Sequence, residues 1–235
     1  MEFSALFADS GAFITRFLHV FAGIIWIGLL YYFNFVQMPF FAETEAPVRS
    51  GAIQKLVPRA LKWFAWGAAL TFLSGLYLIY RNAAGNMADY WTSPSGVVIS
   101  VGASFGTLMF LNVMMVILPK QKIVIASTTS VAKGGQADPR QPAAALQATI
   151  ASRTNAMFSI PMLFGMIGTS HLPAQPDTST GASVFFAIMF GIMLLCEANV
   201  FVFKKQFAPL KTPTSTIVSG FVLCAVFVGS LLCCF

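Results

Sequence analysis

The sequence predicts an all-α protein, a polytopic membrane bundle of six transmembrane helices with both termini outside. Hydrophobic residues make up 57% of the 235 residues and charged residues only 9%, and the mean hydropathy of +0.77 is far above that of a soluble domain. Six apolar segments are each long enough to cross about 30 Å of hydrocarbon as a helix. The basic residues also gather in alternate connections between these segments.

The six segments are expected to form a single transmembrane domain over residues 1–235. The first segment does not resemble a cleavable signal peptide, because its leader carries no basic residue and its apolar run is too long. Between the third and fourth segments, residues 119–145 are rich in small, polar, Pro and Gly residues and predict a flexible cytoplasmic linker. The expected spans are about 11–38, 60–80, 96–118, 146–170, 182–203 and 214–234.

The basic residues predict the orientation of the bundle. Of the 14 Lys and Arg residues, 11 fall in or next to the connections 39–59, 119–145 and 204–213. By the positive-inside rule these connections are cytoplasmic, and six spans then place both termini outside. The same cations account for the net charge of +6. The expected partner is therefore the lipid bilayer, and no nucleic acid is implied.

The chain has only two histidines, and each lies at the edge of a predicted span. The six-span topology brings His19 and His171 to the outer leaflet. Arg16 and Gly23 share the helical face of His19, and Gly168 precedes His171 by three residues on its own helix. Two imidazoles can ligate haem iron, glycines let a porphyrin approach the backbone, and a guanidinium can pair with a propionate. This pattern predicts haem b, with both histidines as iron ligands.

Two other interpretations of the histidines remain open. The imidazoles can simply form hydrogen bonds with backbone carbonyls or with water near the lipid headgroups. Alternatively, they can bind copper together with a methionine such as Met162 or Met166.

A second group of polar residues is expected in the cytoplasmic half of the spans. An unpaired charge at this depth costs at least about 2.5 kcal/mol, so Arg153 and Glu197 are expected to form an ion pair among carboxamides. The group can act as a clamp that holds helices together, or as a path for protons or substrate. Its members are Asn34, Asn112, Arg153, Asn155, Glu197 and Asn199.

Three segments carry a family resemblance: RFLHVFAGIIWIGLLYYFNFVQ, NVMMVILPKQKIVI and RTNAMFSIPMLFGMIGTSH. They resemble the N-terminal membrane domain of bacterial membrane-bound urate oxidases that end in a cytochrome c module. The most specific part is R-T-N-x-x-x-S-I-P-M-L-F, from Arg153 to Phe164. More weakly, the L-H-V-x-A-x-x-x-W pattern of the first segment is similar to the haem-binding protoporphyrinogen oxidases of bacteria.

The resemblance implies a multi-pass protein of the bacterial inner membrane with redox associations. It makes His19, Arg153 and Asn155 candidate functional positions, and His171 matches a histidine at the end of the same helix in the family. The 235 residues do not include a haem-c domain like the one at the end of those oxidases, so this chain is not expected to carry its own cytochrome c. A separate cytochrome c or a larger membrane redox complex is therefore the expected partner, and oligomers are also compatible with the apolar surface.

Three functional hypotheses follow. The first is electron transfer in the membrane through haem b, as a subunit of a membrane oxidoreductase. The second is a non-catalytic structural subunit of a larger membrane complex. The third is a transporter or channel that uses the Arg153–Glu197 layer. The sequence contains no independent catalytic motif, so no catalytic residue is assigned.

Overall fold

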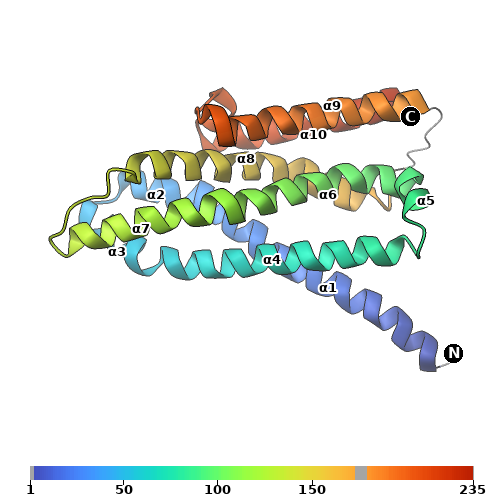
Figure 1. The fold of residues 1–235 in the computed structure, drawn as a ribbon, viewed down its shortest axis with the longest axis horizontal. Helices are drawn as coiled ribbons and strands as arrows, with labels where there is room; N and C mark the ends of the chain where they lie inside the picture. The colour runs from blue at the N-terminus through green and yellow to red at the C-terminus, as the bar shows by residue number, and fades with distance from the viewer. Residues whose placement is uncertain (1–2, 173–178, 235) are drawn as a thin grey trace.

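The computed structural model describes residues 3–172 and 179–234 and contains no strand within these ranges (Figure 1). The prediction of an all-α fold is confirmed. The helices are α1 (Phe3–Tyr31), α2 (Met38–Glu43), α3 (Ala46–Lys55), α4 (Val57–Asn82), α5 (Met87–Thr92), α6 (Pro94–Asn112), α7 (Leu118–Ala132), α8 (Gln141–Gly168), α9 (Ser179–Ala198) and α10 (Pro213–Cys234). The short 3-10 turn η4 (Ala208–Leu210) precedes α10.

Three π-helical segments lie inside the long helices. They are η1 (Tyr32–Gln37), η2 (Val113–Ile117) and η3 (Asn199–Phe203). The first two are followed by prolines, Pro39 and Pro119, which lack the N–H needed for the regular helical ladder. A wider π turn upstream gives the proline ring room, and the helix continues through it. Such turns are rare and often occur at functional sites.

Five of the described helices are long and apolar enough to cross a membrane, namely 11–43, 57–82, 94–132, 181–203 and 213–234. The 28-residue helix α8 is also long enough, but it is not one of these five. Figure 1 shows α8 lying between the α6–α7 helix and the pair α9 and α10. Residues 151–159 of α8 are buried on every side. Because neighbouring helices screen this part of α8 from lipid, it tolerates more polar residues than the other helices.

Glycines allow close contacts between the helices. A Cβ on Gly102 of α6 would lie 3.2 Å from the carbonyl carbon of Gly165 on α8. On α10, a Cβ on Gly220 would lie 2.9 Å from the backbone oxygen of Met157. That oxygen lies four residues before Pro161, which has no N–H to donate to it. Small residues thus let α6 and α10 approach α8 closely, as in many membrane bundles.

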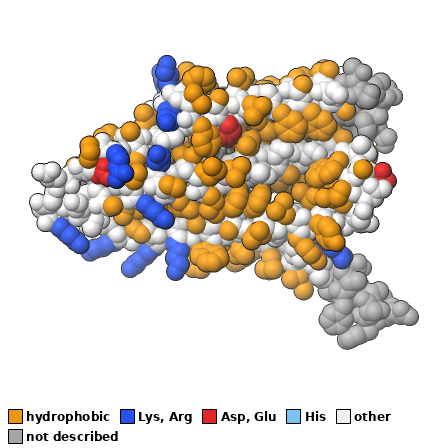
Figure 2. All heavy atoms as spheres, viewed as in Figure 1, with side chains coloured by type: hydrophobic (Ala, Val, Ile, Leu, Met, Phe, Trp, Pro, Cys, Tyr) orange, Lys and Arg blue, Asp and Glu red, His pale blue; other side chains and the backbone are white. Residues whose placement is uncertain are grey.

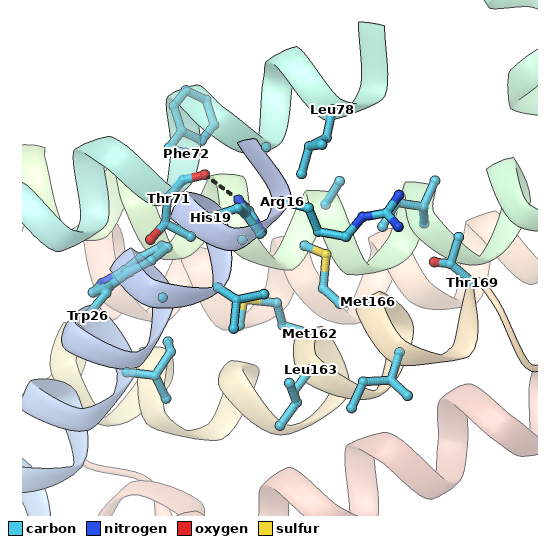
Figure 3. A pocket seen from close by; sticks show the side chains of 18 of the residues that line it. Arg16, His19, Trp26, Thr71, Phe72, Leu78, Met162, Leu163, Met166 and Thr169 are labelled. Carbon is cyan, nitrogen blue, oxygen red and sulfur yellow. Dashed lines mark hydrogen bonds between the residues drawn. The ribbon is translucent and has the colours of Figure 1, made fainter. Parts of the chain in front are cut away.

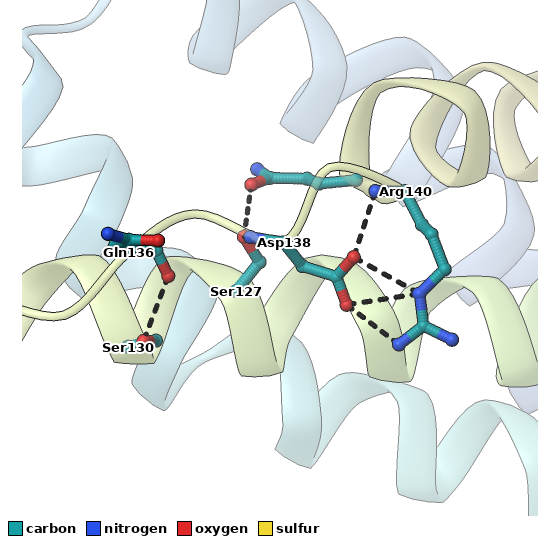
Figure 4. A network of polar contacts seen from close by, with 6 residues as sticks. Ser127, Ser130, Gln136, Asp138 and Arg140 are labelled. Carbon is teal, nitrogen blue, oxygen red and sulfur yellow. Dashed lines mark hydrogen bonds and ion pairs between the residues drawn. The ribbon is translucent and has the colours of Figure 1, made fainter.

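The predicted linker 119–145 is wrong in extent. Residues 118–132 form α7, which continues the α6 helix, and only residues 133–140 connect α7 to α8. Polar contacts hold this connection (Figure 4): Ser127 Oγ accepts the Asp138 N–H at 2.9 Å, and Asp138 forms an ion pair with Arg140 at 2.8 Å. The Arg140 guanidinium holds the pKa of the Asp138 carboxyl below its usual value. Composition suggested a flexible segment because it does not register these local contacts.

Lys and Arg side chains gather at the end of the bundle formed by α2, α3 and α7, which we call the basic end (Figure 2). Hydrophobic side chains are spread over the rest of this face, among polar side chains and backbone. Large apolar side chains such as Trp63, Leu73, Leu194 and Phe221 are more than 60% exposed. A surface of this kind suits contact with lipid tails.

Candidate functional site

A cavity of about 760 Å³ lies among α1, α4, α6 and α8, and we call it the His19 cavity (Figure 3). Its volume is within the range of about 300–1,000 Å³ that is usual for small-molecule and cofactor sites. The walls are mainly apolar. The rim includes Val20 and Ile24 of α1 and Leu163 and Ile167 of α8, which are each more than half exposed. The cavity therefore opens sideways onto the apolar surface of the bundle.

His19 presents one ring nitrogen to the α4 backbone. Its Nδ1 lies 2.9 Å from the carbonyl oxygen of Thr71 and 3.1 Å from Ser74 Oγ. The carbonyl can only accept, and Ser74 already donates its hydroxyl hydrogen to Leu70 O at 2.6 Å. Nδ1 must therefore carry the proton and donate it, which leaves the Nε2 lone pair free in the neutral ring. A backbone carbonyl bound to the second nitrogen is the usual support for a metal-ligating histidine.

Space for the imidazole ring comes from Gly75 on α4. A Cβ at this position would lie 3.0 Å from His19 Cε1, so even an alanine would press on the ring. Thr71, Ser74 and Gly75 were not singled out from the sequence. A small residue one helical turn beyond a threonine was the only available signal, and it is too common to identify a histidine site.

Several other predicted site residues also line the cavity. Arg16 and Gly23 lie on α1 with His19, and Met162 and Met166 come from α8 (Figure 3). The two methionines are four residues apart and share one helical face. Gly106 of α6 leaves space beside the methionines, since a Cβ at this position would lie 3.6 Å from Met162 Sδ. One imidazole, two thioethers and one guanidinium thus surround a single apolar space.

His171 and Gly168 do not line this cavity. His171 is exposed, and its backbone N–H bonds to Gly168 O at 3.0 Å. Gly168 is buried, and a Cβ on it would meet Leu172 and Val98 of α6 instead of the cavity. The structure therefore brings together three of the five predicted cofactor-binding residues. Within the described ranges there is also no cluster of three or more His, Cys, Asp or Glu side chains arranged for a metal ion.

Two hydrogen-bond donors of the cavity lining lack a partner among the described residues. Trp26 is 1% exposed, and its Nε1 is buried without an acceptor. The hydroxyl of Tyr90 on α5 is also buried and also has no acceptor. Buried donors are rarely left unpaired in folded proteins, so both atoms indicate bound water or a ligand with acceptor oxygens.

The second predicted group lies closer to the basic end, and all six of its members are buried. We call it the polar layer: Asn34, Asn112, Arg153, Asn155, Glu197 and Asn199. At its centre, Asn112 Nδ2 donates to Glu197 Oε1 at 2.8 Å and to Asn155 Oδ1 at 3.0 Å. Asn155 Nδ2 in turn donates to Met109 O at 2.9 Å. These bonds join α6, α8 and α9.

The predicted ion pair between Arg153 and Glu197 is wrong. Arg153 Nη1 donates to the backbone oxygens of Leu210 and Lys211, both at 2.6 Å. These oxygens lie at the end of η4, where helical carbonyls have no N–H partner of their own. Among the described residues the only ion pair is Arg140–Asp138. The sequence correctly indicated that both groups need partners, but neutral backbone and amide groups fill that need.

The remaining members of the polar layer support the π segments. Asn34 Nδ2 donates to Leu30 O and to Ser152 Oγ, both at 2.8 Å, and so links α8 to η1. Asn199 exchanges hydrogen bonds with the backbone of Lys205 at 3.0 and 3.1 Å, just beyond η3. Sequence reasoning did not single out the Tyr31–Ser159 hydroxyl pair, whose oxygens lie 2.8 Å apart and which lines the His19 cavity.

A bundle of long apolar helices around a laterally open cavity defines a multi-pass membrane protein. The family described as urate oxidase N-terminal matches residues 82–230, which is more than half of the chain. The chain belongs to this family. The matched range contains the polar layer except for Asn34, and it begins after His19. No curated protein and no solved structure matches the chain.

Proposed function

We propose that this protein is a redox protein of the bacterial inner membrane that holds haem b in the His19 cavity and transfers electrons. The observation that carries the proposal is the state of His19. Its Nδ1 proton is committed to Thr71 O and Ser74 Oγ, so its Nε2 lone pair is available on a cavity-lining side chain. A histidine in this arrangement would hold haem iron through Nε2, with the Thr71 carbonyl as its supporting hydrogen bond.

The other lining residues are of chemical types that suit a porphyrin. Met162 and Met166 offer thioethers from the helix α8, and a His–Met ligand pair is one of the known haem ligations. Met162 or Met166 would therefore hold the haem iron together with His19, and His171, which lies outside the cavity lining, would not. Arg16 and the Tyr90 hydroxyl offer donors for propionate oxygens. The apolar walls, open toward lipid, suit the hydrocarbon edge of the ring.

A bound haem would accept and release one electron at a time. The role of the chain is then to fix its orientation and potential. The Thr71 carbonyl holds the His19 ring in one tautomer and one plane, which strengthens Nε2 as a ligand. The apolar walls keep water from the ring, and the charge of Arg16 favours an anionic edge near the mouth. Each of these factors tunes a haem potential.

We further propose the six-span topology with α8 as the fourth span, both termini outside and the basic end in the cytoplasm. Positive residues at that end favour this orientation. The His19 cavity then lies in the outer half of the membrane. A cytochrome c or a larger membrane redox complex at the outer face is the expected electron partner.

The test is the absorption spectrum of protein purified from haem-replete cells. We expect the Soret and α bands of a low-spin b haem. His19→Ala should remove or strongly shift these bands, whereas His171→Ala, the matched control, should leave them unchanged. Met162→Leu and Met166→Leu should show which methionine is the second ligand, since only one of the two substitutions should convert the spectrum to high spin. A colourless wild-type protein, or loss of the bands in both histidine variants, would contradict the proposal.

A further inference from the structure

We propose that the polar layer and the floor of the His19 cavity form one proton-transfer path, in which Glu197 supplies protons to the cavity through bound water and the hydroxyls of Ser159 and Tyr31. The inference rests on the proposed function, because it assigns the path to a redox group in the cavity. It concerns side chains that the haem proposal does not use.

The path begins at Glu197, the only acidic side chain that is buried among the described residues. No cation compensates it. Its Oε1 accepts one hydrogen bond, from Asn112, and no partner is found for Oε2 among the described residues. Ionisable groups placed inside a membrane bundle usually serve proton or ion movement. Glu197 lies just before η3, and the exposed Lys204 and Lys205 follow that segment, so water at the basic end is within a few residues.

The middle of the path has buried oxygens without partners. Asn112 is fully buried, and its Oδ1 accepts no hydrogen bond although its Nδ2 donates twice. Thr154 is 1% exposed, and its Oγ1 is also unpartnered. Asn34 Oδ1 is a third such atom, on η1, and the Nδ2 of the same side chain donates to Ser152 of α8. Unpaired buried acceptors of this kind are the positions at which internal water binds.

The path ends at the cavity floor. Ser159 lies four residues beyond Asn155 on α8, which is about 6 Å, or one helical turn. Its Oγ donates to the backbone oxygen of Ala156 at 2.7 Å and therefore accepts the Tyr31 hydroxyl hydrogen, with the two hydroxyl oxygens 2.8 Å apart. Both residues line the His19 cavity. A proton that reaches Ser159 passes onward when the Ser159 hydroxyl turns from Ala156 O toward Tyr31 and the Tyr31 hydroxyl turns toward the cavity. The unpaired amide oxygen of Asn112 holds water in place.

The proton balance is simple. When the group in the cavity gains one electron, its negative charge rises by one. One proton would then leave the Glu197 carboxyl as its O–H bond breaks, move through water to Ser159 and Tyr31, and form a new O–H bond on a carboxylate oxygen of that group. Glu197 regains a proton from water at the basic end. The elements packed against α9 are α10, η3 and α6. Their charged or titratable groups are Cys224, Cys233 and Cys234 on α10 and Lys204 and Lys205 after η3, while α6 carries none. Cys196 precedes Glu197 on α9 itself, and Arg153 lies on α8, which contacts η3.

The main experiment is redox potentiometry of the haem as a function of pH. The wild-type midpoint should fall by about 59 mV per pH unit, the value for a tenfold change with one electron. Glu197→Gln and Tyr31→Phe should flatten this dependence. Tyr32→Phe is the matched control, because Tyr32 neither bonds to Ser159 nor lines the cavity. Equal slopes in all four proteins, or no slope in the wild type, would overturn the path.

A second readout does not need haem and separates the two proposals. Infrared spectroscopy in D₂O should show a protonated-carboxyl band that is absent from Glu197→Gln and exchanges readily with solvent. Asn112→Leu should slow that exchange, because it removes the water-binding oxygen. If the protein is colourless but this band behaves as described, haem binding fails while the path stands. A carboxyl that does not exchange, or an Asn112→Leu variant that exchanges as fast as wild type, would refute the path itself.

Discussion

The close approach of α6 and α8 can be tested with two glycines of one helix. Gly102 and Gly106 are four residues apart on α6, and both face α8. A Cβ on Gly102 would lie 3.2 Å from Gly165 C and 3.3 Å from Gly165 Cα, so the contact is with backbone that cannot rotate away. A Cβ on Gly106 would lie 3.6 Å from the flexible Met162 side chain, which is an ordinary contact. Alanine gains up to about 1 kcal/mol of helix propensity at either position.

Overpacking against the α8 backbone should lower the free energy of unfolding of Gly102→Ala by about 1–3 kcal/mol. Gly106→Ala should not show this loss. For a chain of this size, each kcal/mol of lost unfolding free energy lowers Tm by about 2–4 °C. The assay is thermal unfolding of the two variants in the same detergent, each compared with wild type. Gly102→Ala should melt several degrees below Gly106→Ala. If the two variants melt together, α6 and α8 do not approach as closely as described.

Three further predictions concern the remaining parts of the bundle. In a variant without native cysteines, a cysteine at Ser130 should be labelled only from the cytoplasm and one at Ala84 only from outside; the reverse pattern would invert the topology. The side chains of Arg153 and Glu197 share no hydrogen-bond partner, so the effects of Arg153→Ala and Glu197→Ala on the free energy of unfolding should add to within about 0.5 kcal/mol. Strong coupling between the two substitutions would instead indicate that the two side chains form an ion pair. The lowered pKa of Asp138 means that its contacts stabilise the 133–140 connection above the unfolded-state pKa of about 4 and are lost as pH falls through the folded-state value. Amide protection there should therefore be retained at pH 7 and fall below about pH 4, and Asp138→Asn should lower it at pH 7.

Most of the architecture could be predicted from composition because the bilayer imposes one requirement on every span. An apolar run of about 20 residues has few alternatives to a helix in lipid. The boundaries were less predictable. The helix that begins with α6 continues to Ala132 because a π turn accommodates Pro119, and residues 127–141 contact one another through side chains. These effects depend on three-dimensional neighbours, which the hydropathy of a segment does not contain.

The site was predictable in its residue types and less so in its pairings. Helical spacing placed Arg16, His19 and Gly23 on one face, and the cavity contains all three. The pairing of His19 with His171 assumed that equal depth implies contact, but depth does not fix the rotation of a helix about its axis. The Arg153–Glu197 pair failed for a related reason. Backbone oxygens freed at η4 offered Arg153 a partner that the sequence pattern does not show.

The central claim is that the His19 cavity holds a haem through Nε2 of His19. An experimental density map of the protein purified from haem-replete cells tests it most directly. We predict flat, haem-sized density between α1 and α8 in contact with His19 Nε2, with a methionine sulfur of α8 on its other face and none of it in contact with His171. A cavity that contains only water or lipid density, or a haem held elsewhere in the bundle, would contradict the claim.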